Sequence, residues 1–311
     1  MKKQFAAAVD VGGTNTKFGW VDSDGELYGS GSVKTGEFST AEDLIQRVYR
    51  ELQDMINFDE TEAEICGIGV GAPNANYHTG CIHHAPNLDF AKSIVPFASI
   101  FTEISGLKCR ITNDANAAAI GEKIYGKARD MNDFMVVTLG TGLGSGIYTG
   151  GQVLYGSDGM AGEMGHTCLI PGGRKCGCGR LGCIERYVSI GGLTTTFLEV
   201  SEGKKGELRP RQIQALAEEG DQEAIRTYRI TGEYLGLHLS SMAALFSPEA
   251  IFLSGGLAQS GEVLLSPMRK AFEDNLLTHH KGKIKIELSG LKKQKTALLG
   301  AAALAFSSFS Q

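Results

Sequence analysis

The stretch Phe5-Ala-Ala-Ala-Val-Asp-Val-Gly-Gly-Thr-Asn-Thr-Lys-Phe-Gly-Trp-Val21 decides the fold. Its residues 5–11 are mostly apolar and predict a buried strand, Gly12 and Gly13 predict a turn, and residues 18–21 predict a second strand. Residues 26–33 predict a third strand, so we expect the chain to open with an antiparallel meander. The backbone N–H groups of a glycine turn point to one side and can bind an anion without a side chain in the way.

The same pattern returns in the middle of the chain. Residues 134–139 predict a buried strand, Gly140-Thr-Gly-Leu-Gly-Ser-Gly146 predicts a glycine turn, and another strand begins at Ile147. This repetition predicts a duplicated α/β domain with a cleft between the copies. A third glycine turn, Gly255-Gly256, follows an apolar run over residues 250–253. None of the three turns matches the G-x-x-x-x-G-K-[ST] loop or a dinucleotide fingerprint in a strand-to-helix context.

Helices alternate with these strands. Thr40-Ala-Glu-Asp43 resembles a capping box, and the apolar residues from Leu44 to Met55 recur on one helical face, which predicts an amphipathic helix. Strands are expected at residues 64–70 and 107–112. The further predicted helices cover residues 116–125, 221–246 and 296–309.

Composition is that of an ordinary globular protein. The chain has 311 residues, 42% of them hydrophobic and 21% charged, which allows two domains with proper cores. The net charge of −5 is spread out, and no basic stripe is present, which argues against nucleic-acid binding. The N-terminal apolar run ends at Asp10, too early for a signal peptide, and no uncharged stretch could cross a bilayer, so we expect a cytoplasmic protein. Residues 292–295 form the longest basic run, expected to be a solvated loop.

Three cysteines lie within eight residues, Cys176-Gly-Cys178-Gly-Arg-Leu-Gly-Cys183, and His166 precedes them by ten positions. Three thiolates and an imidazole suit tetrahedral Zn²⁺ and leave no position for a catalytic water, so the site should be structural. The alternatives are disulfides or unrelated free thiols, which the odd total of seven cysteines and the expected compartment disfavour. The other four cysteines are expected to be mostly buried apolar residues: Cys66, Cys81, Cys109 and Cys168.

Five motifs are spread along the chain: Asp10-Val-Gly-Gly-Thr14, Asn113-Asp114-Ala-Asn116, Gly140-Thr141-Gly142, Glu163-Met-Gly-His166 and Cys176-x-Cys178-Gly-x-x-Gly-Cys183-x-Glu185. In order and spacing they resemble the ROK family of sugar kinases and repressors. The resemblance covers essentially the whole chain. It implies the duplicated actin- and hexokinase-like (ribonuclease H-like) ATPase fold of two α/β domains with an interdomain cleft. The expected domains are residues 1–117, with a terminal helix at about 297–311 packing back on them, and residues 118–296, which carry the zinc site.

The resemblance also implies an activity, the ATP-dependent phosphorylation of a hexose hydroxyl, with glucose and its 6-hydroxyl as the leading expectation. Asp114 is the expected catalytic base, and Asp10 is expected to hold Mg²⁺ through water. The expected nucleotide and magnesium positions are Asp10, Gly12, Gly13, Thr14, Lys17, Gly140, Thr141, Gly142, Gly255 and Gly256. The expected sugar-binding positions are Gly71, Asn87, Asn113, Asp114, Glu163, His166 and Glu185.

Simpler roles remain open for four of these side chains. Asp114 could be the N-cap of the following helix, and Asp10 could stabilise a turn. Taken alone, His166 would more often be a surface or core histidine, and Glu185 a solvated carboxylate at a helix start. By the resemblance, His166 uses one ring nitrogen for zinc and offers the other to the sugar, and the coordinated loop aims Glu185.

The sequence leaves the sugar undecided. The family often has Pro-Gly where this chain has Pro73-Asn74, so the loop could take a different turn or add a side chain near the sugar. N-acetylmannosamine, N-acetylglucosamine, fructose and allose are alternatives to glucose. A repressor is disfavoured, because the strand containing Asp10 starts within a few residues of Met1, and an inactive sugar-binding protein is disfavoured by Asp114. We expect a homodimer with no nucleic-acid or membrane partner, and a polar loop, without metal, around His78, His83 and His84.

Overall fold

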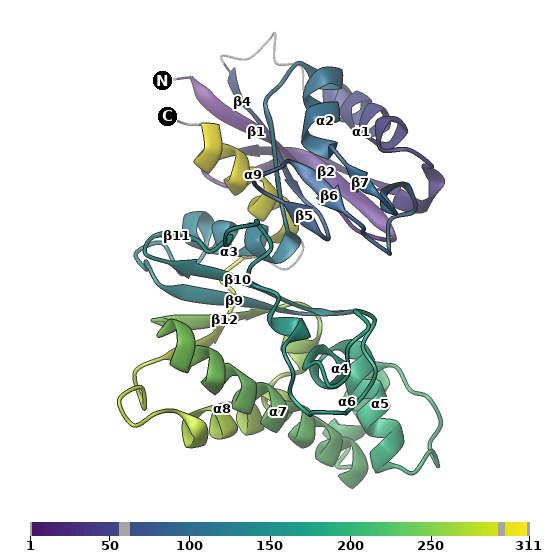
Figure 1. Cartoon of the computed structure of the whole chain (residues 1–311), viewed down its shortest axis with the longest axis vertical. Coiled ribbons are helices and arrows are strands. Elements are labelled where there is room, and N and C mark those ends of the chain that lie inside the picture. The colour runs from purple at the N-terminus through teal and green to yellow at the C-terminus, as the bar shows by residue number, and fades with distance from the viewer. Residues whose placement is uncertain (1, 56–62, 292–295, 310–311) are drawn as a thin grey trace. The chain divides into compact units, whose positions relative to one another are not determined.

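The computed structural model describes residues 2–55, 63–291 and 296–309 (Figure 1). Contacts divide the chain into a first unit, Met1–Met131 with Val153–Ala161 and Gly290–Gln311, and a second unit, Asn132–Gln152 with Gly162–Ser289. The expected boundary after residue 117 falls inside helix α3 (Asp114–Tyr125), which lies whole in the first unit because it packs against the terminal helix α9 (Thr296–Phe309). The basic run 292–295 lies outside the described residues.

The main sheet of the first unit has the strand order β3-β2-β1-β4-β8. β1 pairs antiparallel with β2, and β2 with β3, so the predicted opening meander is confirmed. β4 continues the sheet parallel to β1, and β8 parallel to β4. The strands are β1 (Lys3–Val11), β2 (Asn15–Asp22), β3 (Leu27–Lys34), β4 (Ala63–Gly71) and β8 (Cys109–Thr112); a separate small sheet holds β5 (Ala75–Asn76), β6 (Cys81–His83) and β7 (Ile94–Val95).

Helices cover both faces of this sheet, because β1 is apolar on both sides. Phe5, Ala7 and Val9 pack in one core with α1 (Ala41–Met55) and α2 (Phe97–Ser105), while Ala6 and Ala8 pack with α9 in another (Figure 1). This alternation is the period of two expected for a strand. α1 starts where predicted, since the Asp43 N–H donates to the Thr40 hydroxyl at 3.1 Å and that hydroxyl donates to the Asp43 carboxylate at 2.7 Å.

The sheet of the second unit repeats the first. Its order is β11-β10-β9-β12-β13, with β9 antiparallel to β10 and parallel to β12, which is in turn parallel to β13. The predicted duplication is therefore confirmed at the level of sheet topology. The strands are β9 (Phe134–Leu139), β10 (Leu143–Thr149), β11 (Gln152–Val153), β12 (Ala250–Ser254) and β13 (Lys285–Leu288).

Five α-helices are described in the second unit: α4 (Glu185–Val188), α5 (Ile190–Val200), α6 (Pro210–Glu218), α7 (Gln222–Phe246) and α8 (Glu262–Asn275). The Asp221 carboxylate caps α7 by accepting the N–H groups of Glu223 and Ala224 at 3.1 and 2.9 Å. Short 3₁₀ helices occur at η1 (Thr35–Glu37), η3 (Asp89–Ala91), η4 (Met164–His166) and η5 (Leu257–Ser260). Within the described ranges, no helix has the length and apolar character needed to span a membrane.

Candidate active site and metal centre

Asp114 stands at the junction of β8 and α3. The residue before it, Asn113, is the N-cap of α3, because its side-chain oxygen accepts the N–H of Ala115 at 2.9 Å. The alternative of Asp114 as the N-cap is therefore wrong. Asp114 is the first helical residue, and its carboxylate accepts the same N–H at 2.8 Å. Gly71, at the end of β4, lies beside it, since a Cβ there would be 3.8 Å from the Asp114 Cα.

Asp10 is the second carboxylate at this edge of the sheet. In the strand register it lies opposite Gly71 on β4, and opposite Lys17 on β2. Burial and then the negative charge of Asp114 raise the pKa of Asp10 to about 6, while Lys17 acts in the opposite direction. The pKa of Asp114 is also raised, because the surrounding protein displaces water that would hydrate the ionised form, although the Ala115 N–H opposes this. Two such oxygen donors fit a hard divalent cation, which would relieve their repulsion.

The first glycine turn follows Asp10. The N–H of Gly12 donates to the Asn15 carbonyl at 3.1 Å, and the Gly12 carbonyl accepts the Thr35 hydroxyl at 2.6 Å. A Cβ on Gly13 would lie 3.1 Å from the Cβ of Asn87, so the structure brings Asn87 against this turn. Thr14 and Lys17 are exposed beyond it. The turn therefore lies between the candidate magnesium carboxylate and one expected sugar contact.

The second glycine turn is fastened by Glu185. The Leu143 N–H donates to Glu185 Oε2 at 3.1 Å, and a Cβ on Gly142 would lie only 2.6 Å from that oxygen. A larger residue at this position would require the Glu185 carboxylate to move. The N–H of Ile190, at the start of α5, also donates to the Gly140 carbonyl at 2.9 Å. Sequence reasoning assigned Glu185 to the sugar alone; its bond to the turn joins residues 42 positions apart and carries no local signal.

The third turn divides into two roles. Gly255 has a φ of +93°, and a Cβ on it would be 2.3 Å from the Leu139 carbonyl oxygen, so it packs against the end of β9. Gly256 is the N-cap of η5, and a Cβ there would meet nothing within 4 Å. Gly255 is therefore packed against the sheet, whereas the space beside Gly256 is open.

Four side chains converge in the predicted metal centre. One donor atom from each of His166, Cys176, Cys178 and Cys183 lies within 4.8 Å of the others. The Cys178 and Cys183 sulfurs are 3.6 Å apart, and Cys176 Sγ is 3.6 Å from His166 Nδ1. In a tetrahedron with Zn–S bonds of about 2.3 Å, neighbouring ligand atoms lie about 3.8 Å apart, so these residues fit zinc. Because Nδ1 of His166 is the ring nitrogen that lies near Cys176 Sγ, Nε2 would remain available to bond another group.

The remaining cysteines correct part of the prediction. All seven are free thiols, so the disulfide alternative is wrong. Cys66, Cys81 and Cys109 are half-buried rather than buried, and Cys168 is exposed. The backbone of Cys168 pairs with that of Cys183 in an antiparallel bridge. Cys168 therefore lies beside the loop that contains Cys176, Cys178 and Cys183, which we term the metal loop, but it is not one of the four candidate ligands.

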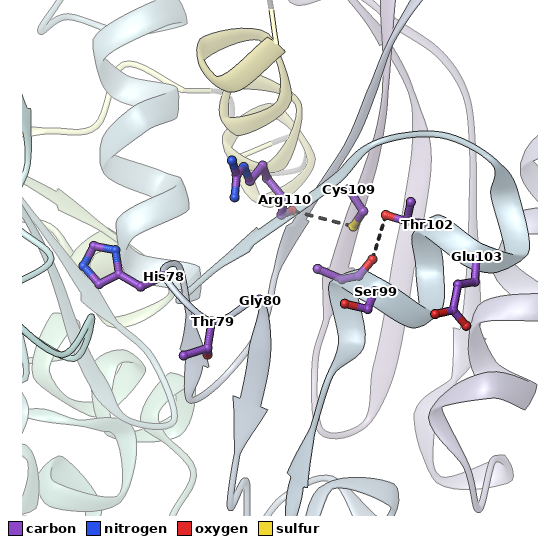
Figure 2. Close-up of a pocket in the computed structure, with 9 residues that line it drawn as sticks. His78, Thr79, Gly80, Ser99, Thr102, Glu103, Cys109 and Arg110 are labelled. Carbon is purple, nitrogen blue, oxygen red and sulfur yellow. Dashed lines mark hydrogen bonds between the residues drawn. The ribbon is translucent and has the colours of Figure 1, made fainter.

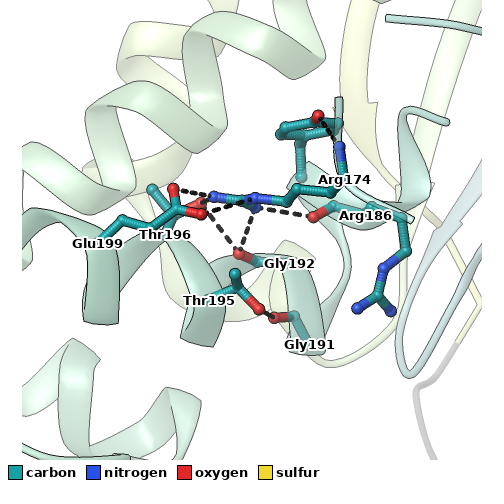
Figure 3. Close-up of polar contacts among 8 residues, drawn as sticks. Arg174, Arg186, Gly191, Gly192, Thr195, Thr196 and Glu199 are labelled. Carbon is teal, nitrogen blue, oxygen red and sulfur yellow. Dashed lines mark hydrogen bonds and ion pairs between the residues drawn. The ribbon is translucent and has the colours of Figure 1, made fainter. Parts of the chain in front are cut away.

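An arginine that the sequence did not single out, Arg174, makes polar contacts with residues of the two helices α4 and α5 (Figure 3). The Arg174 guanidinium contacts Glu199 at 2.5 and 3.1 Å, and donates to the carbonyls of Arg186 and Gly192 at 2.8 and 3.2 Å and to the Thr196 hydroxyl at 3.0 Å. It is only 15% exposed. Because these partners lie on α4 and α5, Arg174 fixes the residues just before Cys176 to the helices that follow the loop.

A second missed contact lies next to His166. The Thr167 hydroxyl is 2.7 Å from the Met164 carbonyl and 2.7 Å from Nε2 of His238, on α7. Burial lowers the pKa of His238, so this imidazole is neutral at physiological pH. The His238 contact thus holds the segment that carries His166 against the long helix of the second unit. A buried histidine in a helix gives no sequence signal of such a partner.

The histidine loop is polar, as expected. His78 contacts the Gly156 carbonyl at 3.3 Å, His83 contacts the Thr79 hydroxyl at 3.2 Å, and His84 contacts the Lys92 carbonyl at 3.2 Å. Asn74 has a φ of +53°, a conformation that glycine adopts easily and asparagine tolerates. Its side chain donates to the His84 carbonyl at 3.1 Å, so Asn74 forms a left-handed turn and ties that turn to the histidine loop.

Two surface cavities of the first unit lie apart from the predicted nucleotide, sugar and metal residues. One, of about 380 Å³, is lined by His78, Thr79, Ser99, Thr102 and Arg110 among others (Figure 2). The other, of about 430 Å³, is lined by residues of α1, α2 and the chain between Phe90 and Pro96. None of the predicted site residues lines either cavity.

The structure thus groups the predicted residues into two sets. The first unit holds Asp10, Gly12, Gly13, Thr14, Lys17, Gly71, Asn87, Asn113 and Asp114; the second holds Gly140, Thr141, Gly142, Glu163, His166, Cys176, Cys178, Cys183, Glu185, Gly255 and Gly256. The expected catalytic base, Asp114, and the expected magnesium-binding residue, Asp10, are in the first set. The metal loop and its neighbours are in the second.

Comparison with known proteins agrees with these motifs. A glucokinase from Halalkalibacterium halodurans is 31% identical over 287 residues, 88% of this chain and 86% of that protein. A glucokinase from Streptomyces coelicolor is 30% identical over 312 residues, 96% of each chain. The crystal structure of a ROK family glucokinase from Streptomyces griseus in complex with glucose and AMPPNP superposes with a TM-score of 0.80 at 30% identity, covering 97% of this chain and 99% of that one. The predicted fold class is confirmed by this similarity.

A model of the ROK family matches residues 6–308, nearly the full length. The chain therefore belongs to the ROK family.

Proposed function

We propose that this protein is an ATP-dependent hexose kinase that transfers the γ-phosphoryl group of ATP to the 6-hydroxyl of glucose. The single observation that carries the proposal is Asp114: a carboxylate with a raised pKa at the junction of β8 and α3, where Asn113 and not Asp114 is the N-cap. The glucokinase relatives and the complex of one of them with glucose and AMPPNP support the choice of sugar and phosphoryl donor.

In the proposed reaction, Asp114 accepts the proton of the attacking sugar hydroxyl. The hydroxyl oxygen then bonds to the γ-phosphorus as the bond from that phosphorus to the β–γ bridging oxygen breaks, and ADP leaves. Its raised pKa makes the ionised Asp114 a stronger base than an ordinary aspartate. Because phosphoryl transfer passes through a loose transition state, alignment of the two substrates supplies most of the remaining rate enhancement.

The phosphates and a magnesium ion would be held by the glycine turns and Asp10. When bound, Mg²⁺ would offset negative charge on the phosphates. Asp10 would bind it through water, since Mg²⁺ usually keeps several waters and takes few carboxylates. The proposed phosphate contacts are Gly12, Gly13, Thr14, Lys17, Gly140, Thr141, Gly142 and Gly256.

The sugar would be recognised by polar groups from both sets: Gly71, Asn87, Asn113, Glu163, His166 and Glu185. A structural zinc on the three cysteines and Nδ1 of His166 would fix the imidazole and leave Nε2 to bond a sugar hydroxyl. The metal would therefore act on recognition and have no contact with the phosphoryl group.

A coupled assay of ADP release tests the function across a panel of sugars: glucose, mannose, fructose, allose, N-acetylglucosamine and N-acetylmannosamine. We expect the highest kcat/KM with glucose. A higher value for an N-acetylhexosamine or for fructose would reassign the substrate while leaving the reaction class in place, and no turnover with any sugar would refute the proposal. We also propose a homodimer, which multi-angle light scattering would test directly.

A further inference from the structure

The segment Val153–Ala161, which we term the strap, belongs to the first unit although the residues on both sides belong to the second. It is followed at once by Gly162 and then by Glu163, the first residue of the motif that also contains His166. The strap is therefore a direct covalent link between the first unit and two proposed sugar contacts.

One buried asparagine holds the middle of the strap. Asn76 is 2% exposed, and its side-chain amide donates to the Asp158 carbonyl at 2.6 Å. Its side-chain oxygen accepts the N–H groups of His78 and Thr79 at 2.9 and 3.1 Å. A Cβ on Gly159 would lie 2.6 Å from that oxygen, so the strap packs directly on the amide. The side-chain oxygen of Asn76 thus bonds to the turn that follows it, and the side-chain nitrogen bonds to the strap.

Stacked rings hold the start of the strap. Tyr155 stacks on Tyr77 with a centroid separation of 4.2 Å and an interplanar angle of 7°. His78 lies edge-on to Tyr155 at 5.8 Å and contacts the Gly156 carbonyl at 3.3 Å. The Arg110 guanidinium lies 5.6 Å from the Tyr77 ring centre. Because stacking and the amide bond act on different residues, the strap is fastened at two points.

A backbone hydrogen bond within the strap extends the effect of these contacts to its last residue, Ala161. The N–H of Ala161 donates to the Tyr155 carbonyl at 3.0 Å, which links its two ends. The next residue, Gly162, has a φ of +94°, and its carbonyl accepts the Ser145 hydroxyl at 2.6 Å and the Met164 N–H at 2.8 Å. Gly162 is therefore where the chain passes from contacts with the first unit to contacts with the second.

We propose that Asn76 and the Tyr77–Tyr155 stack are positioning residues for the hexose. By fixing the strap they limit the positions open to Glu163 and His166, so these side chains are ordered before the sugar binds. Loss of the fastening would leave that ordering to be completed on binding, which weakens sugar affinity. This inference rests on the proposed roles of Glu163 and His166 as sugar contacts.

The decisive substitution is Asn76→Asp. It keeps the oxygen that accepts from His78 and Thr79, and it replaces the amide donor by an oxygen facing the Asp158 carbonyl. We expect KM for glucose to rise about 10-fold, with kcat and KM for ATP within about 2-fold of wild type. Zinc content should stay at one ion per chain, and exchange of the amide hydrogens of residues 155–161 should accelerate.

A second pair of variants tests the stack. Tyr77→Leu should raise KM for glucose as Asn76→Asp does, whereas Tyr77→Phe, which keeps the stacked ring, should restore the wild-type value. Tyr148→Leu is the matched control, because Tyr148 stacks on Phe134 at 4.8 Å in the second unit and has no place in the strap. That control should leave KM for glucose unchanged. If Asn76→Asp does not fold, the Tyr77 pair decides.

An unchanged KM for glucose in folded Asn76→Asp or Tyr77→Leu would overturn the inference. So would equal rises in KM for glucose and for ATP, which would indicate general loosening. Glu163→Gln separates this failure from that of the proposed site: if Glu163→Gln weakens glucose binding and the strap variants do not, only the positioning role is lost. If Glu163→Gln has no effect, the sugar-contact assignment falls, and the positioning role falls with it.

Discussion

The two glycine turns at the start of the duplicated sheets occupy the same topological place and are built differently. The turn at Gly12–Gly13 follows Asp10, a strand residue whose pKa is raised by burial and by Asp114. The turn at Gly140–Gly142 has no such acid on its strand; it is held by Glu185 and by the first N–H of α5. The two sheets therefore share the same strand–turn–strand backbone but differ in the side chains at the turn. The first turn follows a carboxylate, Asp10, whereas the second is held in place by a hydrogen bond to Glu185.

The carboxylates therefore differ in use: those of the first unit have raised pKa values, and that of the second unit holds a backbone turn in place. In the first unit, the charge of Asp114 adds to burial in raising the pKa of Asp10, and burial also raises the pKa of Asp114, as the proposed cation-binding and proton-accepting roles would lead one to expect. In the second unit, the Glu185 carboxylate is used by a backbone N–H, and its other oxygen lies 3.9 Å from Cys176 Sγ. Glu185 thus contacts both the second turn, a proposed phosphate site, and Cys176 of the proposed zinc site.

The largest effect should come from the first unit. Asp114→Asn removes the base and should lower kcat by about 10²- to 10⁴-fold, while KM for glucose changes only a few-fold, because the amide can still hydrogen-bond the hydroxyl. The coupled assay measures kcat, and the melting temperature checks the fold. Equal activity in both proteins would sink the kinase assignment.

The metal loop should come next. Cys178→Ser removes one of four ligands and should abolish stoichiometric zinc, raising KM for glucose at least about 10-fold or unfolding the loop. Metal analysis and calorimetric sugar titration measure the two effects on the same sample. Cys168→Ser is the matched control, since Cys168 is exposed and outside the ligand set, and should behave as wild type. A folded, zinc-free Cys178→Ser with normal glucose affinity would disprove the role of the metal.

A smaller effect should distinguish the clamp from the sugar contact. Glu185→Gln keeps an oxygen that can accept the Leu143 N–H, so it should raise KM for glucose several-fold and leave KM for ATP nearly unchanged. Glu185→Ala removes the clamp as well and should raise both constants, by about 5- to 10-fold for ATP. Should the alanine variant leave KM for ATP at its wild-type value, the second turn does not depend on Glu185.

The smallest effect concerns stability. Asp10 has a folded-state pKa of about 6, above its value in the unfolded chain, so the folded state holds the proton more tightly and loses stability as pH rises from about 4 past 6. Asp10→Asn removes this penalty and should stabilise the magnesium-free protein at pH 8 by up to about 3 kcal/mol. The gain should vanish toward pH 4. Thermal melts across this range measure it, and a constant difference at all pH values would contradict the electrostatic cause.

Much of the fold could be predicted because its signals are local. The strand–turn–strand pattern at residues 5–21 and again at 134–148, and the Thr40 cap, each lie within a short window and were found where expected. The boundary after residue 117 was misplaced because α3 is held by α9, almost two hundred residues away in the chain. Local patterns cannot show such a partner.

The sequence by itself determined the identity and order of the chemical groups: the carboxylates, the glycine turns and the Cys₃His set, whose residue types and spacings restrict what they can bind. Only the tertiary structure decided which of them touch. In the folded chain Asn113 caps α3, and Glu185 accepts an N–H of the second turn. Arg174 bonds to the helix that follows the metal loop, and Asn76 bonds to the strap. These contacts join residues that lie far apart in the chain or compete for a single N–H. They form only when the whole chain has packed, because no short segment contains both partners or fixes their geometry.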